Sequence, residues 1–199
     1  MMRLNSNLLY EGKLICGAPP HMRTALLSRL RMPNPAIPIA FVDVPSQSVK
    51  SVTGSHSNVV EANTVNVLVR LLITRFFIPE DTLVICLYRD QKFLCQFLLQ
   101  DTAVTVGTLN RAQGSERSVV ILCTTRTSLE QGSKAVFFSN AKRLNMAFSR
   151  AKDGMFVTGS IKCLQDAVTW SAIVAWCKDR NLVTNLHFFD STARAALQL

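Results

Sequence analysis

A mainly parallel β-sheet with helices on both faces, an α/β fold, is the architecture that this sequence predicts. Apolar runs alternate with amphipathic segments between residues 37 and 180. The runs 82–87 and 118–125 are apolar almost throughout, as in parallel strands that are buried on both faces. Hydrophobic residues make up 48% of the 199 residues and charged residues only 18%, so the chain has enough apolar surface for a proper core.

The first half of the chain begins without a clear period. Residues 1–36 contain several prolines, and we expect only one or two helical turns there, at 23–30. Residues 37–44 predict a strand between two prolines, and the serine-rich stretch 46–57 predicts a loop. Asn58 is expected to cap the next helix, with Glu61 in capping-box position, and that helix should run to about Phe76.

The second half continues the alternation. We expect strands at 82–87, 104–109, 118–125 and 155–158, and helices at 89–100, 140–152, 161–168 and 170–180. In the helix at 89–100 we expect Phe93, Phe97 and Leu98 to face the core. The chain shows no internal repeat or linker. We therefore predict a single domain over 1–199, with a core at about 5–180 and a tail at 181–199.

Ligands of parallel sheets usually bind at the carboxyl ends of the strands. The loop after Leu109 and the segment around Asn140 fit that position, so the sequence predicts a site there. With 22 basic against 13 acidic residues, the net charge is +9. A polyanionic partner such as nucleic acid explains that balance, and so does a charge that only keeps the protein soluble.

The six cysteines predict free thiols rather than disulfides or a metal centre. None forms a C-x-x-C pair, and no histidine lies at zinc-ligand spacing, so no metal site is expected. Cys86 and Cys123 lie in apolar runs, where a thiol behaves as a small hydrophobic group. Free thiols are typical of the reducing cytoplasm or nucleus. We see no signal peptide and no apolar run of membrane-spanning length, and expect no membrane partner.

Two segments carry candidate chemistry. In the loop Gln113-Gly114-Ser115-Glu116, the glycine lets backbone amides approach a phosphate, and the glutamate can accept hydrogen bonds from ribose hydroxyls. From these four residues alone, an ordinary polar turn between strands is the better explanation. In the segment 142–152, Arg143 and Arg150 are seven residues apart, on the same stripe of the expected helix. A rigidly mounted arginine can stabilise a transferring phosphoryl group, although a solvated basic face is the simpler explanation.

The order in which these two segments occur favours a functional site over an ordinary turn and a solvated basic face. Q-G-x-E, then an apolar strand, then the basic stretch R-L-N-x-A-x-S-R-A-K resembles motifs V and VI of superfamily 1 helicases. The resemblance is to the branch that includes the nonsense-mediated-decay RNA helicases, and it covers about residues 5–165. The stretch NLLYEGKL at 7–14 resembles the opening of the second RecA-like domain in that branch. N-x-x-E-A at 58–62 and the segment LYRDQ at 87–91 are also similar to it.

The resemblance implies a RecA-like domain, three-layered with a mainly parallel sheet, and roles for particular residues. Arg150 would be the arginine finger at the γ-phosphate of ATP with Mg²⁺, and Arg143 would support it. Gly114 would lie near the phosphate and Glu116 would bind the ribose, while Gln113 would couple nucleotide to nucleic acid. The residues implied near single-stranded RNA or DNA are Thr108, Asn110, Arg111, Tyr88 and Gln91.

Two departures from the helicase pattern leave a second hypothesis open. No G-x-x-x-x-G-K-[ST] loop and no acidic Walker B strand occur in the chain. It would therefore supply one wall of an ATP cleft, with an N-terminal RecA-like domain in cis or in trans supplying the other, and should not hydrolyse ATP alone. Asn110 stands where the family usually has an acid, and Arg111 where it has a small residue. The alternative is a degenerate, non-catalytic module that binds nucleic acid or protein. A Rossmann-type enzyme would need a G-x-G-x-x-G fingerprint, which is lacking.

Overall fold

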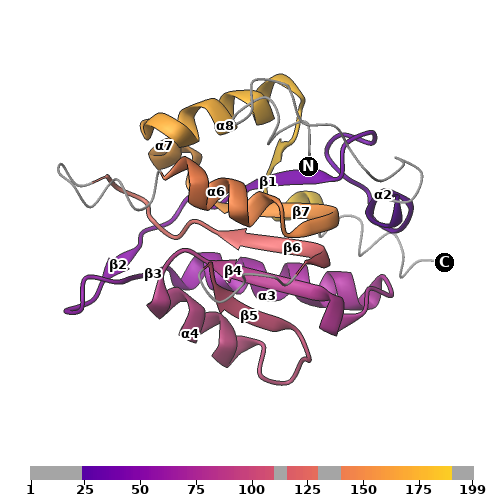
Figure 1. The fold of residues 1–199 in the computed structure, drawn as a ribbon, viewed down its shortest axis with the longest axis horizontal. Helices are drawn as coiled ribbons and strands as arrows, with labels where there is room; N and C mark the ends of the chain where they lie inside the picture. Colours follow the sequence, from indigo (N-terminus) through magenta and orange to yellow (C-terminus); the bar gives the residue numbers. More distant parts are fainter. Residues whose placement is uncertain (1–23, 110–115, 130–139, 190–199) are drawn as a thin grey trace.

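The structure is a computed structural model that describes residues 24–109, 116–129 and 140–189. A six-stranded sheet lies at its centre, in the order β5-β4-β6-β7-β1-β8, and every paired neighbour is parallel (Figure 1). The strands are β1 (Ile39–Asp43), β4 (Thr82–Cys86), β5 (Thr105–Thr108), β6 (Arg117–Cys123), β7 (Ala151–Gly159) and β8 (Val183–Thr184). The predicted fold class is confirmed.

One face of the sheet is covered by α2 (Ala25–Arg29), α3 (Val59–Thr74) and α4 (Arg89–Leu98). Leu26, Leu68 and Leu72 from these helices are fully buried against strand residues such as Phe156. α2 lies so close to β7 that a Cβ at Gly154 would come within 2.1 Å of Leu26 Cδ2, so only glycine fits there. This face forms one of two apolar cores.

The opposite face is covered by α6 (Ala141–Phe148), α7 (Ile161–Leu164) and α8 (Val168–Asp179) (Figure 1). Leu144, Ala147 and Phe148 of α6 are buried as predicted. The ring of Phe148 meets fully buried Trp170 edge-on, with ring centroids 6.5 Å apart. Helices on both faces give the three layers that the sequence predicts.

Several local predictions are wrong for identifiable reasons. In α4, Phe93 and Phe97 are 53% and 66% exposed, whereas Leu98 is partly buried against the core as predicted. The buried residues of the helix are Gln91, Lys92 and Cys95. Gln91 faces inward because the buried Glu61 accepts from its amide, so apolarity alone was misleading for the two phenylalanines. The helix expected at 140–152 ends at Phe148, because the chain turns there and enters the long strand β7.

Three smaller elements complete the fold. The serine-rich loop contains the two-stranded antiparallel ribbon β2 (Val49–Lys50) with β3 (His56–Ser57), and η2 (Pro79–Asp81) is a turn of 3₁₀-helix before β4. β8 pairs with β1 from beyond residue 180, where no element was predicted, so the described core extends past that point. Across the described ranges, no helix combines the length and apolarity that crossing a bilayer requires.

Candidate functional site

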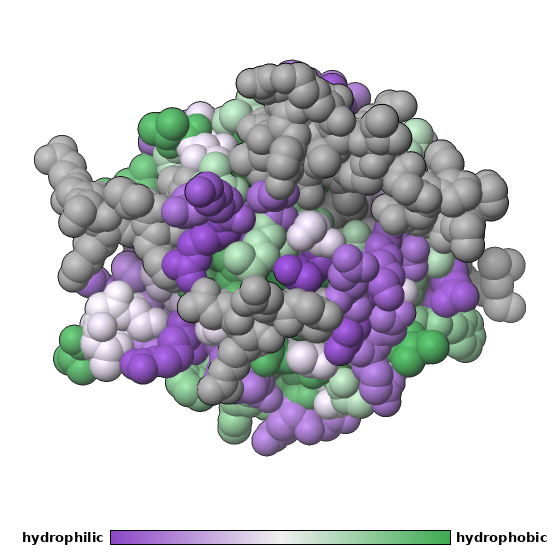
Figure 2. Space-filling view, viewed as in Figure 1, coloured by the Kyte–Doolittle hydropathy of each residue, from purple (hydrophilic) through white to green (hydrophobic). Residues whose placement is uncertain are grey.

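Two of the predicted site residues meet at the amino end of the sheet. Glu116 directly precedes β6 and Arg150 directly precedes β7, and these strands are neighbours. The backbone N–H of Arg117 donates to the carbonyl of Arg150 at 2.9 Å, which fixes the two segments side by side. Figure 2, viewed from the same side as Figure 1, shows hydrophilic residues gathered where β6 begins.

The sequence predicted this site at the carboxyl end of the sheet, and for Glu116 and Arg150 that prediction is wrong. The chain leaves β5 at its carboxyl end but enters β6 at its amino end, which carries Glu116 to the opposite edge. Likewise α6 begins after the carboxyl end of β6 and leads back to the start of β7, which places Arg150 beside Glu116. In a parallel sheet each connection must return the chain in this way.

Two guanidinium groups at this edge have unused hydrogen-bonding capacity. Nε of Arg117 and Nε of Arg150 are both buried and have no hydrogen-bond partner in the part of the chain that the structure describes. Arg117 Nη1 donates to the carbonyl of Glu116 at 3.0 Å, while the side chain of Glu116 is exposed. A buried donor without a partner costs free energy, and phosphate oxygens are partners that guanidinium groups bind well. Arg117 was not among the predicted site residues, although its place directly after Glu116 in the sequence could have indicated it.

Arg143 does not share the position of Arg150. It lies in the first turn of α6, where its backbone N–H donates to the side chain of Asn140 at 3.1 Å, while Arg150 follows the end of the helix. Seven residues correspond to about 10 Å along a helix axis. Because α6 ends at Phe148, before Arg150, the two arginines do not share one stripe of a helix as the sequence predicted.

Two residues predicted to bind nucleic acid lie together at the carboxyl end. Thr108 ends β5 and pairs in register with Cys86 of β4, and Tyr88 follows two residues later. The half-buried ring of Tyr88 packs edge-on against His56, with centroids 5.0 Å apart. A strand of seven residues spans about 20 Å. The length of β6 therefore separates this pair from the arginines at the amino end.

Gln91 is placed differently, because its side chain is fully buried. Its amide oxygen accepts from the backbone N–H of Asn58 at 2.7 Å, and its Nε2 donates to Glu61 Oε2 at 3.0 Å. With its amide engaged in this way, any influence of Gln91 on nucleic acid would pass through the residues that it positions. Asn110, Arg111, Gln113 and Gly114 lie outside the described residues.

Glu61 forms the centre of the buried network to which Gln91 belongs. Its Oε1 accepts from the backbone N–H groups of Thr124 and Thr125 at 2.9 and 3.1 Å, and from Thr158 Oγ1 at 3.0 Å. The side chain thus joins α3 to the carboxyl ends of β6 and β7. Asn58 caps α3 as predicted, by accepting from the Glu61 N–H at 3.0 Å. The reciprocal half of the capping box is not formed, because Gln91 takes the Asn58 N–H instead.

Burial raises the pKa of Glu61 to about 8, against the lowering effect of hydrogen bonds from Thr125 and Thr158. Perturbed carboxyl groups often mark functional sites, but structural networks perturb them as well. Glu61 is completely buried, and four hydrogen bonds hold its two oxygens. We therefore assign it a structural role, which sequence reasoning missed because it depends on contacts with residues far along the chain.

A cavity of about 690 Å³ also opens at the carboxyl end, between β1 and β7. The connections after these adjacent strands pass to opposite faces of the sheet, which is the topological switch point where α/β proteins often bind ligands. Asp43, Ser160 and Lys162 are among its lining residues. The Asp43 carboxylate accepts from the backbone N–H of Ile161 at 2.9 Å, so it is already engaged. No residue predicted to bind a ligand lines this cavity.

The fold and these two edges define a RecA-like α/β domain. A family model described as an AAA domain matches residues 1–162, and the chain belongs to this family, which corresponds to the C-terminal region of superfamily 1 helicases. The resemblance stated from the motifs is thereby confirmed.

Curated relatives agree with this assignment. The chain is 31% identical over 202 residues to an uncharacterised ATP-dependent helicase of Caenorhabditis elegans, covering 98% of this chain and 13% of that protein. It is 30% identical over 185 residues to the ATP-dependent helicase upf1 of Schizosaccharomyces pombe, covering 88% and 20%. For the DNA replication ATP-dependent helicase/nuclease DNA2 of Xenopus tropicalis, the identity is 28% over 221 residues, covering 98% and 20%. The chain thus spans a fifth or less of each of these relatives.

Proposed function

We propose that this chain is the C-terminal motor domain of an ATP-dependent superfamily 1 helicase acting on single-stranded RNA or DNA. The observation that carries the proposal is the pair of buried Nε atoms of Arg117 and Arg150 at the amino end of the sheet, which have no hydrogen-bond partner among the described residues. In this proposal that edge forms one wall of an ATP cleft. A P-loop domain, in the same chain or a partner, forms the other wall.

The residues at this edge suit a nucleotide. Bound ATP with Mg²⁺ would supply the phosphoryl group that water attacks. The Arg150 guanidinium, supported by Arg117 and from further away by Arg143, would stabilise the charge that develops on the phosphate oxygens. The exposed Glu116 carboxylate would accept hydrogen bonds from the ribose hydroxyls. Gly114 and Gln113, by their likeness to the family motif, would face the phosphate and couple nucleotide to nucleic acid.

The Mg²⁺ ligands would come from the other domain. Magnesium takes oxygen ligands in octahedral geometry. Within the described ranges, the one group of three close metal-ligating side chains consists of cysteines. Soft sulfur ligands do not suit Mg²⁺. This chain would therefore contribute cationic and ribose contacts and leave metal binding to its partner domain.

Nucleic acid would bind along the carboxyl end, where Thr108 ends β5 and Tyr88 follows the end of the neighbouring strand β4. By the motif likeness, Asn110 and Arg111 would join them, with Gln91 acting through Asn58 and Glu61, the residues that its side chain contacts. An aromatic ring beside polar groups is a stacking platform for bases, and backbone contacts would make binding salt-dependent and weakly sequence-specific. Nucleotide and nucleic acid would then occupy opposite ends of one rigid sheet.

The test is nucleic-acid-stimulated ATPase activity after the chain is joined to a complete P-loop helicase domain. Arg150→Ala should lower kcat about 10³-fold, the lower range of arginine-finger effects. The exposed Lys142 on α6 offers a matched control, and Lys142→Ala should leave kcat within about twofold of the wild type. An Arg150→Ala rate equal to that of the control would refute the finger assignment.

A second measurement separates the motor from the non-catalytic binding module. Fluorescence anisotropy with a single-stranded oligonucleotide, in RNA and DNA forms and over a salt series, reports binding by the chain alone. A half-motor should bind weakly alone and tighten when the P-loop domain is joined. Tight, salt-sensitive binding without that domain, with no further gain on joining, would support the binding module instead.

A further inference from the structure

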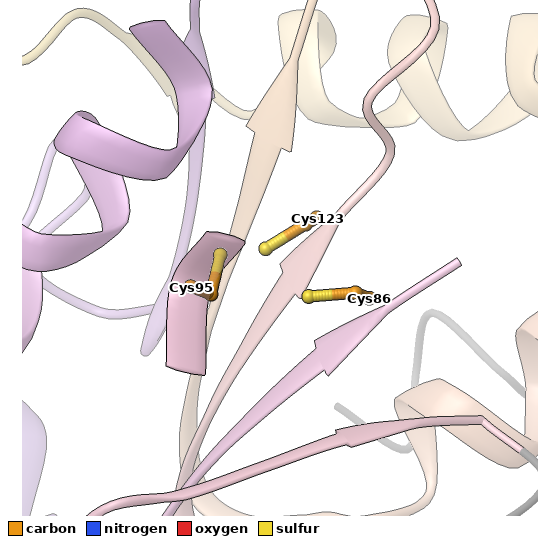
Figure 3. Close-up of side chains that lie close together, drawn as sticks. All are labelled: Cys86, Cys95 and Cys123. Carbon is orange, nitrogen blue, oxygen red and sulfur yellow. The ribbon is translucent and has the colours of Figure 1, made fainter. Parts of the chain in front are cut away.

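Three cysteine side chains converge inside the core that lies between the sheet and α3 and α4. Cys86 is the last residue of β4, Cys123 is the last residue of β6, and these two are register partners on adjacent strands. Cys95 points toward them from α4 (Figure 3). The three Sγ atoms lie within 4.8 Å of one another, and all three residues are fully buried.

Sequence spacing does not predict this cluster. The cysteines are separated by 8 and 27 intervening residues and form no C-x-x-C pair. They meet because parallel strands end at the same edge and α4 folds back over that edge. The five cysteines in the described ranges are free thiols, as expected, but three of them are a group and not isolated small hydrophobes.

The geometry is close to that of a three-coordinate thiolate metal site. Sulfur ligands about 2.3 Å from a common metal ion in trigonal geometry lie about 4.0 Å from one another. The Sγ–Sγ distances in the structure are at most 4.8 Å. The sulfur atoms would therefore need to approach one another by less than about 1 Å to bind a common ion, which small side-chain rotations can supply. Soft sulfur ligands select thiophilic ions such as Cu(I) and Zn²⁺.

Ligand number favours the monovalent ion. Zn²⁺ sites in proteins are almost always four-coordinate, and within the described residues no further His, Cys, Asp or Glu joins the group. Three sulfur ligands satisfy Cu(I). The cluster therefore fits the ion that needs no fourth ligand.

We propose that Cys86, Cys95 and Cys123 form a binding site for a single Cu(I) ion. The ion is held by three Cu–S bonds, without change in oxidation state of copper or sulfur. Any thiol that becomes a thiolate ligand releases its proton to solvent, so binding tightens as pH rises. Because the three sulfurs come from β4, β6 and α4, bound Cu(I) fixes α4 to the sheet beside Tyr88.

The test is anaerobic titration of the reduced full-length chain with Cu(I) in the presence of the chromogenic chelator bicinchoninate. The wild type should withhold one equivalent of Cu(I) per chain, and its Tm should rise by several degrees. Cys86→Val, Cys123→Val and Cys95→Ala should each abolish that retention; valine suits the strand positions and alanine the helix. Cys163→Ala and Cys177→Ala remove buried thiols outside the group and should retain the full equivalent. The wild type and all five variants in this titration carry the background substitution Cys16→Ser, which removes the cysteine outside the described residues.

Copper X-ray absorption of the loaded wild type keeps the proposal testable even if a core variant fails to fold. It should show a shell of three sulfurs at about 2.3 Å, and a two-sulfur or nitrogen-containing shell would overturn the three-cysteine site. No Cu(I) withheld by the wild type, or equal retention by cluster and control variants, would also overturn it. A parallel titration with Zn²⁺ against a zinc chelator should show no retention, and retention of Zn²⁺ in place of Cu(I) would refute the choice of ion.

Discussion

The two ends of the central sheet carry glutamates with opposite surroundings. At the carboxyl end, Glu61 is fully buried, and four hydrogen bonds hold its carboxyl oxygens. At the amino end, Glu116 is exposed, and the Nε atoms of the neighbouring Arg117 and Arg150 are buried with no hydrogen-bond partner in the described ranges. Polar groups that are satisfied within the chain stabilise the fold, whereas those left unsatisfied are available to a ligand. The comparison predicts that stability depends on the carboxyl-end network and catalysis on the amino end.

The largest effect on stability is expected from Glu61→Ala. The substitution leaves the N–H groups of Thr124 and Thr125 buried without their acceptor and opens a cavity, so the free energy of unfolding should fall by about 4 kcal/mol. Chemical denaturation measures this. Asp101 makes an exposed ion pair with Arg70, and Asp101→Ala as a control should cost less than about 1 kcal/mol. Equal losses in the two variants would contradict the structural role of Glu61.

At the amino end, the expected effect is on rate and not on stability. Arg150→Lys keeps the positive charge but loses the planar fork that binds phosphate oxygens, so kcat of the joined two-domain protein should fall about 10²-fold. The Tm should stay unchanged, because Arg150 Nε has no hydrogen bond within the described chain to lose. A fall in Tm with kcat preserved would show that Arg150 stabilises the fold and does not take part in catalysis.

Glu61 should also make stability depend on pH. Its pKa in the folded protein is raised from 4.5 to about 8, so the neutral form is the one that folding favours. That contribution is complete below pH 4.5 and is lost as pH rises toward 8, by at most about 1.4 kcal/mol per pH unit. Unfolding curves between pH 5 and 8 should therefore show a stability difference between wild type and Glu61→Gln that shrinks as pH rises. A difference that grows with pH would show that Glu61 folds as the anion.

The smallest of these effects concerns Tyr88 at the carboxyl end. If its ring stacks on a base, Tyr88→Leu should weaken single-strand binding by about 1 kcal/mol, roughly fivefold, in anisotropy. The exposed Phe97 on α4 provides the matched comparison, and Phe97→Leu should leave affinity unchanged. Equal losses would place the nucleic acid along α4.

The sequence predicted the elements better than their relationships. The apolar run 82–87 and the N-cap Asn58 were recognisable because strand burial and helix capping are local properties. Phe93 and Phe97 of α4 were wrongly predicted to face inward, because the polar Gln91 is buried there instead, through a hydrogen bond to Glu61, thirty residues away. The end of the sheet that carries Glu116 and Arg150, and the meeting of Cys86, Cys95 and Cys123, depend on strand direction and register, which no local pattern contains.

The most direct test of the contrast between the two ends makes the same substitution at each. Glu61→Gln and Glu116→Gln are compared in the joined two-domain protein, by denaturant unfolding and by titration with a fluorescent ATP analogue. We expect Glu61→Gln to lose about 2 kcal/mol of stability with nucleotide affinity retained, because an amide donor then faces the Gln91 donor. Glu116→Gln should keep its stability and bind nucleotide several-fold more weakly, by about 1 kcal/mol. Loss of stability in Glu116→Gln, or of nucleotide affinity in Glu61→Gln alone, would contradict this account.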